Sequence, residues 1–218
     1  MIVADDSRNP MRLPGVETVV LPYNVGVSVG RQAALDRVAT RYCVVLDDDH
    51  VFYRRTALEE AFSILEAHPD IDILGGDEIL LPFYAASSFW RGDVYPTRPA
   101  THPTGTKIAG LVVRDRVPNF FLSRTDRLRL VGWDAELKTL DHIDFFSRAR
   151  GILTTVYDPG FRVLHARTPF DAHYMERRLD FDASFAVLRD RYGELAYTLE
   201  GLPTAYEPKL ATTGRRPT

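Results

Sequence analysis

Three consecutive aspartates, Asp47, Asp48 and Asp49, directly follow the apolar run 43–46. A short run rich in β-branched residues is typical of a buried strand, and open α/β sheets bind their ligands at the carboxyl ends of strands. Adjacent carboxylates repel one another unless they are exposed or a cation neutralises them. Their oxygens suit Mg²⁺ or Mn²⁺ that bridges to a phosphate. The triplet therefore indicates either a metal site or a solvated acidic turn.

A second group of candidates, Asp141, His142 and Asp144, lies in a segment with helical periodicity at residues 139–150. Asp141 and Asp144 are three residues apart, so they project from adjacent faces of one helical turn. A carboxylate can take a proton as a general base, and imidazole titrates near neutral pH. We therefore expect proton transfer at this helix, with helix capping as the alternative role of Asp141.

The elements that hold these side chains alternate between strand-like and helix-like segments, which is typical of α/β proteins. Strands are expected at residues 2–4, 18–21, 43–46, 71–74, 108–113, 119–122, 152–157 and 161–164. Helices are expected at residues 28–41, 56–68, 125–131, 139–150 and 171–192. Thr56 and Glu59 form a capping-box signature at one helix start. Gly75 and Gly76 are expected to close the strand before them.

Residues 85–106 are rich in proline and small residues, which is typical of a loop. Loops of this length are usually functional lids or disordered segments. Phe89, Trp90 and Tyr95 favour a lid that packs on another part of the molecule. A floppy insertion is the alternative.

The composition of the 218-residue chain is ordinary, with 45% hydrophobic residues, 26% charged residues and a net charge of −3. The chain is long enough for one domain, which we expect over residues 1–200, followed by a tail at 201–218. The charge balance gives no reason to expect nucleic acid as a partner. A single cysteine, Cys43, fits a reducing compartment and reads as a buried structural thiol. We find no signal peptide and no apolar stretch of about 20 residues, so we expect a soluble, cytoplasmic protein without a transmembrane segment.

Taken in order, several motifs resemble glycosyltransferases of the GT-A fold. They are Ala4-Asp5-Asp6-Ser7, Gly30-Arg31-Gln32-Ala33-Ala34, Leu46-Asp47-Asp48-Asp49, Asn119-Phe120-Phe121-Leu122-Ser123-Arg124-Thr125, Val131-Gly132-Trp133-Asp134, Asp141-His142-Ile143-Asp144-Phe145-Phe146 and Leu164-His165. The motif sequences are particularly similar to those of the β-1,4-N-acetylgalactosaminyltransferase group, the ganglioside-type enzymes and their bacterial relatives. The resemblance covers about residues 1–192. It implies a GT-A-like (Rossmann-like) α/β fold with a mixed, mostly parallel sheet flanked by helices.

The resemblance also implies an activity, which is metal-dependent, inverting transfer of a sugar from a UDP-sugar to an acceptor hydroxyl. The sugar is expected to be an N-acetylhexosamine, the acceptor a carbohydrate or glycoconjugate, and the cofactor Mn²⁺ or Mg²⁺. Asp49 would bind the metal directly, and Asp47 would contact the ribose, metal-bound water or the ion. His165 would supply a further ligand, although a histidine after an apolar run is otherwise a packed or surface residue.

Other positions would contact the nucleotide. In the family the carboxylate at Asp5 and Asp6 reads the uracil edge, and the region of Arg31 lines the nucleotide pocket together with Asp48. An Asx turn is the alternative for Asp5 and Asp6, and an ordinary surface position is the alternative for Arg31.

Two positions would border the acceptor sugar, namely Trp133 and Asn119. Aromatic faces suit stacking on sugar rings, and core packing is the alternative for Trp133. The family often carries a Glu-Asp pair where this chain has Asp141-His142, so His142 occupies the usual base position. We rank Asp144 first as the base, then His142, then Asp141.

One departure from the family concerns the amino-terminal strand. Typical members begin with another strand and helix, whereas Met1 stands at what should be the second strand. An absent central strand would leave an unpaired sheet edge, which favours aggregation or a homo-oligomer. This departure motivates an alternative function, a non-catalytic binding or scaffold module with an incomplete nucleotide pocket. A nucleotidyltransferase is disfavoured because the chain has no Gly-rich phosphate loop near its first strand.

Overall fold

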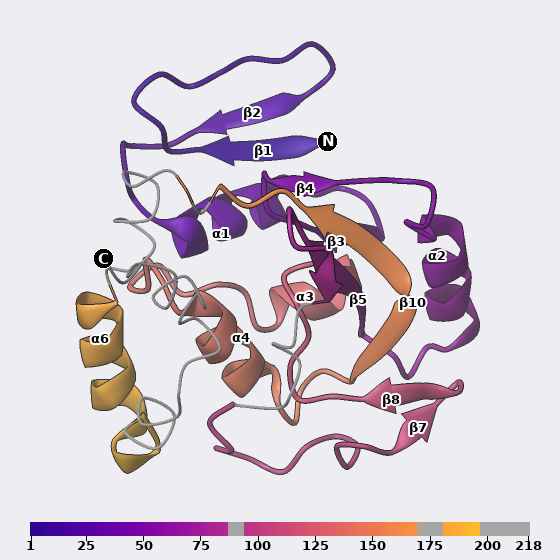
Figure 1. Ribbon diagram of the computed structural model, residues 1–218. Helices are drawn as coiled ribbons and strands as arrows, with labels where there is room; N and C mark the ends of the chain where they lie inside the picture. Colours follow the sequence, from indigo (N-terminus) through magenta and orange to yellow (C-terminus); the bar gives the residue numbers. More distant parts are fainter. Residues whose placement is uncertain (87–93, 169, 171–180, 197–218) are drawn as a thin grey trace, which may run out of the picture.

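The computed structural model describes residues 1–86, 94–168, 170 and 181–196. The strands are β1 (Ile2–Asp5), β2 (Glu17–Val20), β3 (Tyr42–Val45), β4 (His50–Val51), β5 (Ile73–Leu80), β6 (Ala85–Ala86), β7 (Lys107–Ile108), β8 (Leu111–Val113), β9 (Phe121–Arg124) and β10 (Thr155–His165). The helices are α1 (Val27–Arg37), α2 (Leu58–Ala67), α3 (Thr125–Arg129), α4 (Asp141–Ala149) and α6 (Asp182–Tyr192). Figure 1 shows the helices arranged around a central twisted sheet.

The central sheet has the order β3-β9-β5-β10-β8-β7, with β4 paired to β10 and β6 paired to β5. The ladder between β5 and β10 is parallel, and β9 runs antiparallel between β3 and β5. The strands β3, β5 and β10 therefore run in one direction, and their carboxyl ends lie at one edge of the sheet. The α/β class and the mixed sheet predicted from the sequence are confirmed.

Different helices cover the two faces of the sheet. Side chains alternate along each strand, so neighbouring residues pack against different helices. Ile73 lies in a core with residues of α1, α3 and α4, whereas Leu74 lies in a core with Ala61 and Leu65 of α2. A third cluster joins α4 to α6 through Leu140 and Leu188. The sheet is thus flanked by helices on both sides.

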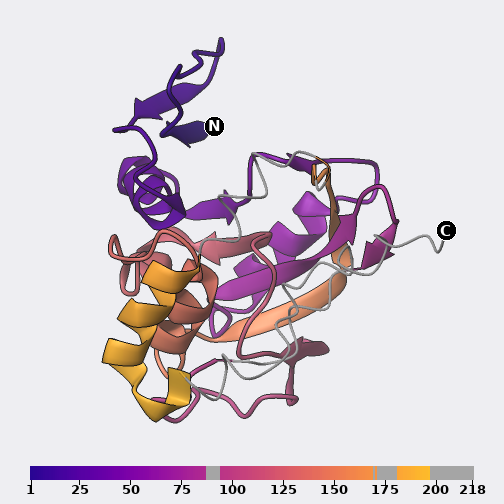
Figure 2. The same cartoon turned by 60° about the vertical axis from the view of Figure 1, so that its left-hand side comes forward.

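The first two strands form a separate parallel sheet in which Ile2 pairs with Glu17 and Asp5 with Val20. Within the described residues β1 pairs with β2 alone and β3 pairs with β9 alone, so each has one edge without a ladder. Figure 2 shows this small sheet projecting beyond α1, which links it to the rest of the molecule.

The structure differs from the sequence expectations at several boundaries. Gly75 and Gly76 lie inside β5, where a Cβ atom would collide with Val117 and Phe120. The segment 108–113 is a hairpin whose turn residues, Ala109 and Gly110, both have positive φ, as a two-residue type I′ turn requires.

The expected strands 152–157 and 161–164 are one strand, β10, which continues through Pro159 and Gly160. A register shift between Tyr157 and Arg162 absorbs these residues as a bulge. Turn-forming residues therefore mark an irregularity in the strand and not its end.

The capping box expected at Thr56 is wrong. The helix begins at Leu58 without a side-chain cap, and the Thr56 hydroxyl accepts a hydrogen bond from the Tyr53 amide at 3.0 Å. Cys43 is half-buried and packs against the core.

Some expectations fall outside the described residues, namely Phe89 and Trp90 of the lid, the first part of the helix 171–192, and the tail 201–218. Tyr95 is buried and stacks on Tyr192, with 4.2 Å between ring centroids. No helix among the described residues combines the length and apolar character that crossing a bilayer requires.

Candidate metal and donor site

The acid triplet forms a turn that is tied to the end of β10. The amide of His50 donates to the carbonyl of Asp47 at 3.2 Å, which closes the turn. His50 and Val51 form β4, and His50 lies directly opposite His165 of β10. The Ala166 amide also donates to the carbonyl of Asp49 at 2.8 Å. These backbone contacts bring the triplet and the histidine together across more than 100 residues of sequence.

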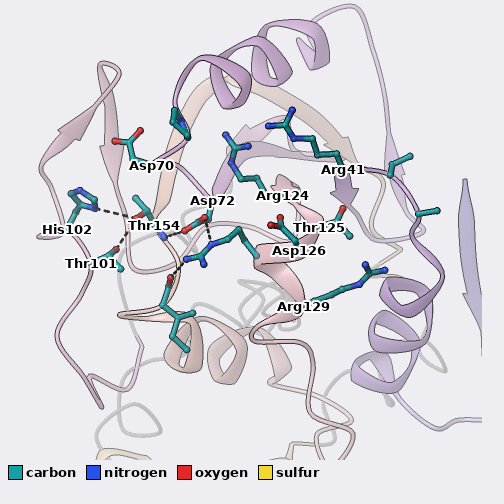
Figure 3. A pocket seen from close by; sticks show the side chains of 15 residues that line it. Arg41, Asp70, Asp72, Thr101, His102, Arg124, Thr125, Asp126, Arg129 and Thr154 are labelled. Atoms are coloured by element: carbon teal, nitrogen blue, oxygen red, sulfur yellow. Dashed lines mark hydrogen bonds and ion pairs between the residues drawn. The ribbon is translucent and has the colours of Figure 1, made fainter.

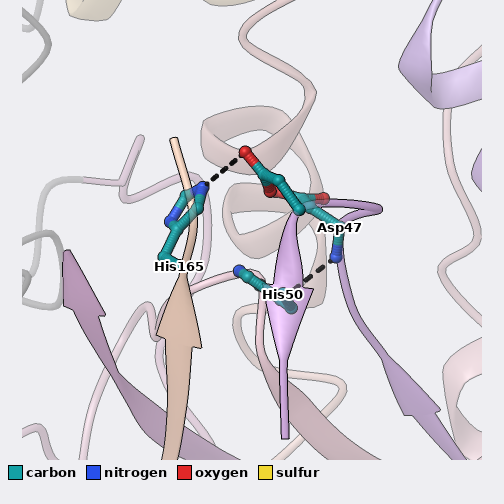
Figure 4. Close-up of side chains that lie close together, drawn as sticks. Asp47, His50 and His165 are labelled. Carbon is teal, nitrogen blue, oxygen red and sulfur yellow. Dashed lines mark hydrogen bonds and ion pairs between the residues drawn. The ribbon is translucent and has the colours of Figure 1, made fainter. Parts of the chain in front are cut away.

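Four side chains at this edge each offer a ligand atom, and these atoms all lie within 4.8 Å of one another: Asp47, Asp49, His50 and His165. Figure 4 shows the histidine rings approaching each other beside the turn. Two carboxylates and two imidazoles form a donor set that fits a divalent transition-metal ion. Asp48 is exposed and lies outside this group.

His165 lies between two carboxylates, with its Nε2 3.1 Å from Asp49 Oδ2 and its Nδ1 3.2 Å from Glu78 Oε2. Burial alone would lower the pKa of His165, but these two carboxylates outweigh it and raise the pKa to about 9. Burial alone would raise the pKa of Glu78, yet His165 and His50 hold it well below its usual range. The cluster therefore carries charge that is compensated internally when no metal is bound.

Arg31 connects the acid turn to α4. It projects from α1, and its guanidinium donates one N–H to Asp47 and another to Asp141. Burial would lower the pKa of Arg31, but the two carboxylates raise it further above its usual range. Burial raises the pKa of Asp141, with Asp47 adding to the effect and Arg31 opposing it. Asp141 thus lies one side chain away from the candidate metal ligands.

The other two candidates on α4 have different surroundings. The carboxylate of Asp144 is completely buried and accepts hydrogen bonds from Arg148 at 2.7 Å, Arg191 at 2.5 Å and the Tyr192 hydroxyl at 2.8 Å. These contacts anchor α6 on α4. All the carboxylate oxygens of Asp144 are therefore occupied by its neighbours.

His142 is buried, and its Nε2 lies 2.5 Å from the carbonyl of Val117. Because a carbonyl can only accept, Nε2 carries the proton, and Nδ1 has no hydrogen-bond partner among the described residues. Burial, together with Arg116, lowers the pKa of His142 to about 3. The ring is therefore neutral at physiological pH.

The nucleotide and acceptor candidates are spread more widely. Asp5 accepts hydrogen bonds from the amides of Ser7 and Met11, both at 2.9 Å, so it forms the Asx turn that the sequence left open. Asp6 accepts from the Gly26 amide at 3.0 Å and thereby connects β1 to the start of α1.

Trp133 is buried and stacks on Phe145 with 5.0 Å between ring centroids, in the core beneath α4. Its amide donates to the Gln32 side chain at 2.8 Å. Asn119 is half-buried and precedes Phe120, whose carbonyl accepts from the Gly76 amide. The structure therefore places the Trp133 ring in the core, the alternative to sugar stacking.

Sequence reasoning missed two members of the cluster, His50 and Glu78. The position of His50 directly after the triplet was an available signal, since a two-residue strand can return it toward the same edge. Glu78 was hidden because Gly75 and Gly76 were taken as the end of the strand. Extending the alternation through them would have placed Glu78 inside β5.

Comparison with known proteins places the chain in a family. Residues 3–125, more than half of the chain, match the model of Glycosyl transferase family 2. The chain is 36% identical over 165 residues to beta-1,4 N-acetylgalactosaminyltransferase 1 of Mus musculus, covering 70% of this chain and 31% of the relative. The chain therefore spans about a third of the length of that curated relative.

Solved structures show the same fold at low sequence identity. S. aureus TarS, residues 1–349 in complex with UDP, matches with a TM-score of 0.56 and 14% identity over 90% of this chain and 54% of that TarS chain. The mannosyltransferase PcManGT from Pyrobaculum calidifontis, in complex with GDP-Man and Mn²⁺, matches with a TM-score of 0.51 and 15% identity over 80% of this chain and 47% of its own. The chain belongs to glycosyl transferase family 2, has the GT-A fold, and is similar to the β-1,4-N-acetylgalactosaminyltransferases.

Proposed function

We propose that this chain is a metal-dependent, inverting glycosyltransferase that moves an N-acetylhexosamine from a UDP-sugar to an acceptor hydroxyl. The observation that carries the proposal is the connected set of Asp49, His165, Asp47, Arg31 and Asp141. It joins a divalent-cation donor set to a buried carboxylate on a separate helix. The similarity to beta-1,4 N-acetylgalactosaminyltransferase 1 supports the choice of sugar, and the UDP-bound TarS supports the choice of nucleotide.

The donor set fits Mn²⁺ or Mg²⁺ through its carboxylates, and a bound ion would stabilise the charge that develops on the departing diphosphate. Asp49 and His165 would hold the ion, with Asp47 at its side. Arg31 fixes the orientation of Asp47, because its guanidinium is buried between two carboxylates. We also propose that residues 1–200 form a single glycosyltransferase domain.

Among the base candidates, the surroundings favour Asp141. Its raised pKa makes it a stronger base than an exposed carboxylate, whereas the oxygens of Asp144 are already bonded and the pKa of His142 is too low. In the proposed step the acceptor oxygen attacks the anomeric carbon, and its proton moves to the Asp141 carboxylate. The bond from that carbon to the diphosphate breaks on the opposite face, which inverts the centre.

Recognition of the uracil edge by Asp6, nucleotide contact by Asp48 and acceptor contact by Asn119 are further parts of this proposal. Asp6 accepts a hydrogen bond from the Gly26 amide just before α1, and Arg31 lies within α1, which supports a nucleotide position near that helix. The turn formed by Asp5 would position this region and leave contact with the base to Asp6.

The test is turnover of UDP-N-acetylglucosamine and UDP-N-acetylgalactosamine, measured as UDP release with Mn²⁺, with Mg²⁺ and with EDTA. We expect release of UDP that EDTA abolishes. Asp141→Asn should lower the rate by about 100-fold or more, because general-base catalysis contributes that much. Asp144→Asn should lower the rate only in proportion to lost folded protein. Equal loss of rate per folded molecule in both variants would reject Asp141 as the base.

The divided sheet favours a second candidate function. Because β1 and β2 are separate from the central sheet within the described part of the chain, the nucleotide side of the site rests on α1 and a few contacts. A non-catalytic binding or scaffold module is compatible with that architecture. It predicts no UDP release with any ion tested, together with a biological role that Asp49→Ala leaves intact.

A further inference from the structure

A buried carboxylate lies directly behind the candidate metal ligands. Glu78 projects from the middle of β5 and is 2% exposed. Burying a charge is costly unless partners compensate it, so the position of Glu78 requires an explanation. Its two oxygens face two different histidines, one on β4 and one on β10.

The contacts form a chain that runs from one end of the acid turn to the other. Asp49 faces Nε2 of His165 at 3.1 Å, and Nδ1 of the same ring faces Glu78 at 3.2 Å. The other oxygen of Glu78 lies 3.4 Å from Nε2 of His50, whose Nδ1 accepts a hydrogen bond from the Asp47 amide at 3.2 Å. A single carboxylate thus contacts both rings of the cluster.

We propose that Glu78 is a positioning residue that makes this a nitrogen-containing metal site, selective for transition-metal ions over Mg²⁺. The inference rests on the proposed function in so far as both require a metal at Asp49 and His165. It adds a residue outside the ligand set and a preference among ions.

The chemistry follows from which nitrogen carries the proton. When Nδ1 of His165 donates its hydrogen to Glu78, the lone pair of Nε2 faces Asp49 and is available to a metal. A carboxylate behind a ligating histidine fixes the ring orientation and raises its basicity. Imidazole nitrogen suits Co²⁺ and Zn²⁺ better than Mg²⁺, which takes oxygen ligands in a strict octahedron. The expected affinity order is therefore Mg²⁺ below Mn²⁺ below Co²⁺.

The competing explanation is that Glu78 merely forms a buried ion pair with the histidines. The neighbouring residue Asp77 provides a control that distinguishes this explanation from a positioning role. Asp77 precedes Glu78 on β5, is 4% exposed and faces Arg162 at 3.9 Å. Because successive residues of a strand point to opposite faces, Asp77 lies away from the histidines. Asp77→Asn therefore removes a buried carboxylate from the same strand without touching the cluster.

The experiment titrates Co²⁺, Mn²⁺ and Mg²⁺ into the metal-free protein by calorimetry and records the visible absorption of the Co²⁺ form, which reports nitrogen ligation. Glu78→Gln should weaken Co²⁺ binding by about 10-fold to 100-fold and change the absorption spectrum, while Mg²⁺ affinity changes by less than about threefold. Asp77→Asn should leave the Co²⁺ affinity, the spectrum and the ratio of Co²⁺ to Mg²⁺ affinity unchanged. Near-UV circular dichroism establishes that each variant is folded.

If Glu78→Gln binds Co²⁺ as tightly as wild type does, and likewise binds Mg²⁺ as tightly, the positioning role is overturned and the proposed function still stands. Absence of any metal binding by wild type would contradict both. If Glu78→Gln does not fold, Glu78→Asp keeps the charge but shortens the side chain, and unchanged Co²⁺ selectivity in that variant would likewise overturn the inference. Because no sugar donor is present, failure of UDP-sugar turnover does not affect these outcomes.

Discussion

Charged side chains gather at both ends of the central sheet, and the two groups differ in what their polar atoms contact. At the carboxyl ends, Asp47, Asp49, His50 and His165 turn their polar atoms toward one another around a common point. At the amino ends, arginines and aspartates line a pocket of about 870 Å³ (Figure 3). Its charged residues are Arg41, Arg124, Arg127, Arg129, Asp70, Asp72 and Asp126.

The arginines of this pocket mainly satisfy backbone carbonyls. Arg124 donates to the carbonyls of Ile71 and His68, at 3.1 Å and 3.4 Å, and so holds the end of α2. Arg129 donates to Val38 at 2.6 Å and holds the end of α1. Arg127 pairs with Asp72 at 2.8 Å. Helix carboxyl ends leave carbonyls without partners, and these side chains supply the donors.

The comparison shows that the number of charges does not identify a functional site. The pocket at the amino ends also gathers charges, but its arginines are already bonded to carbonyls and carboxylates of the fold. The carboxyl edge concentrates acceptors whose best common partner is a cation. We therefore expect substitutions at the amino ends to change stability and substitutions at the carboxyl ends to change ligand binding.

The largest effect is expected for Arg124→Ala. Its removal deprives several buried carbonyls of a charged donor, so the free energy of unfolding should fall by about 3 kcal/mol. Urea denaturation followed by circular dichroism measures this. Metal affinity per folded molecule should stay the same, and a stable variant with altered metal binding would break the comparison.

Asp49→Ala should produce the opposite pattern. Removing a direct ligand should weaken Mn²⁺ binding by about 100-fold or more, equivalent to about 2.7 kcal/mol. The unfolding free energy should fall by less than it does in Arg124→Ala, because His165 keeps Glu78 as a second carboxylate partner. Calorimetric Mn²⁺ titration measures the affinity, and Asp126→Ala, a carboxylate in the pocket, is the matched control with no expected effect.

The free energy of unfolding should depend on pH through His142, a buried residue of α4. Its pKa is lowered to about 3 in the folded protein, below the unfolded value of about 6.5. The unfolded state therefore binds the proton first, so stability is fully present above pH 6.5 and is lost as pH falls toward 3. Between pH 7 and pH 5 the loss from this group should be about 2 kcal/mol.

Replacing the titrating ring should remove that part of the pH dependence. Urea denaturation at pH 7 and pH 5 should give a smaller difference for His142→Asn than for wild type. Parallel pH profiles for the two proteins would show that His142 is not the group responsible.

The smallest effect is expected for Arg41→Ala. Arg41 pairs with Glu66 at 3.1 Å, but its side chain is 69% exposed, so solvent screens the pair. The free energy of unfolding should change by less than about 0.5 kcal/mol. A thermal melt that shows a loss comparable to that of Arg124→Ala would mean that exposed charges at the amino ends also carry the fold.

Much of this arrangement follows from local sequence. The run before Asp47 and the alternation of elements predicted an α/β sheet with acids at a strand end, and the ordered motifs predicted the family. The structure brings Asp47, Asp49 and His165 together. Their roles as ligands stay predictions.

The remainder depends on contacts between distant residues. Arg31 contacts Asp47 and also Asp141, which is 110 residues away, and no local pattern encodes this connection. Two of the three partners that occupy Asp144 come from α6, more than 40 residues further along. Glu78 was missed because glycine pairs usually turn the chain, whereas Gly75 and Gly76 make room for Val117 and Phe120 beside β5.

We propose that the carboxyl edge of the sheet binds a metal and a nucleotide and that the amino-end pocket is structural. Calorimetric titration of UDP with Mn²⁺, and then with EDTA, tests it most directly in wild type, Asp49→Ala and Asp126→Ala. We predict micromolar UDP binding that EDTA and Asp49→Ala abolish and that Asp126→Ala preserves. UDP binding that survives EDTA and Asp49→Ala but is lost in Asp126→Ala would contradict the account.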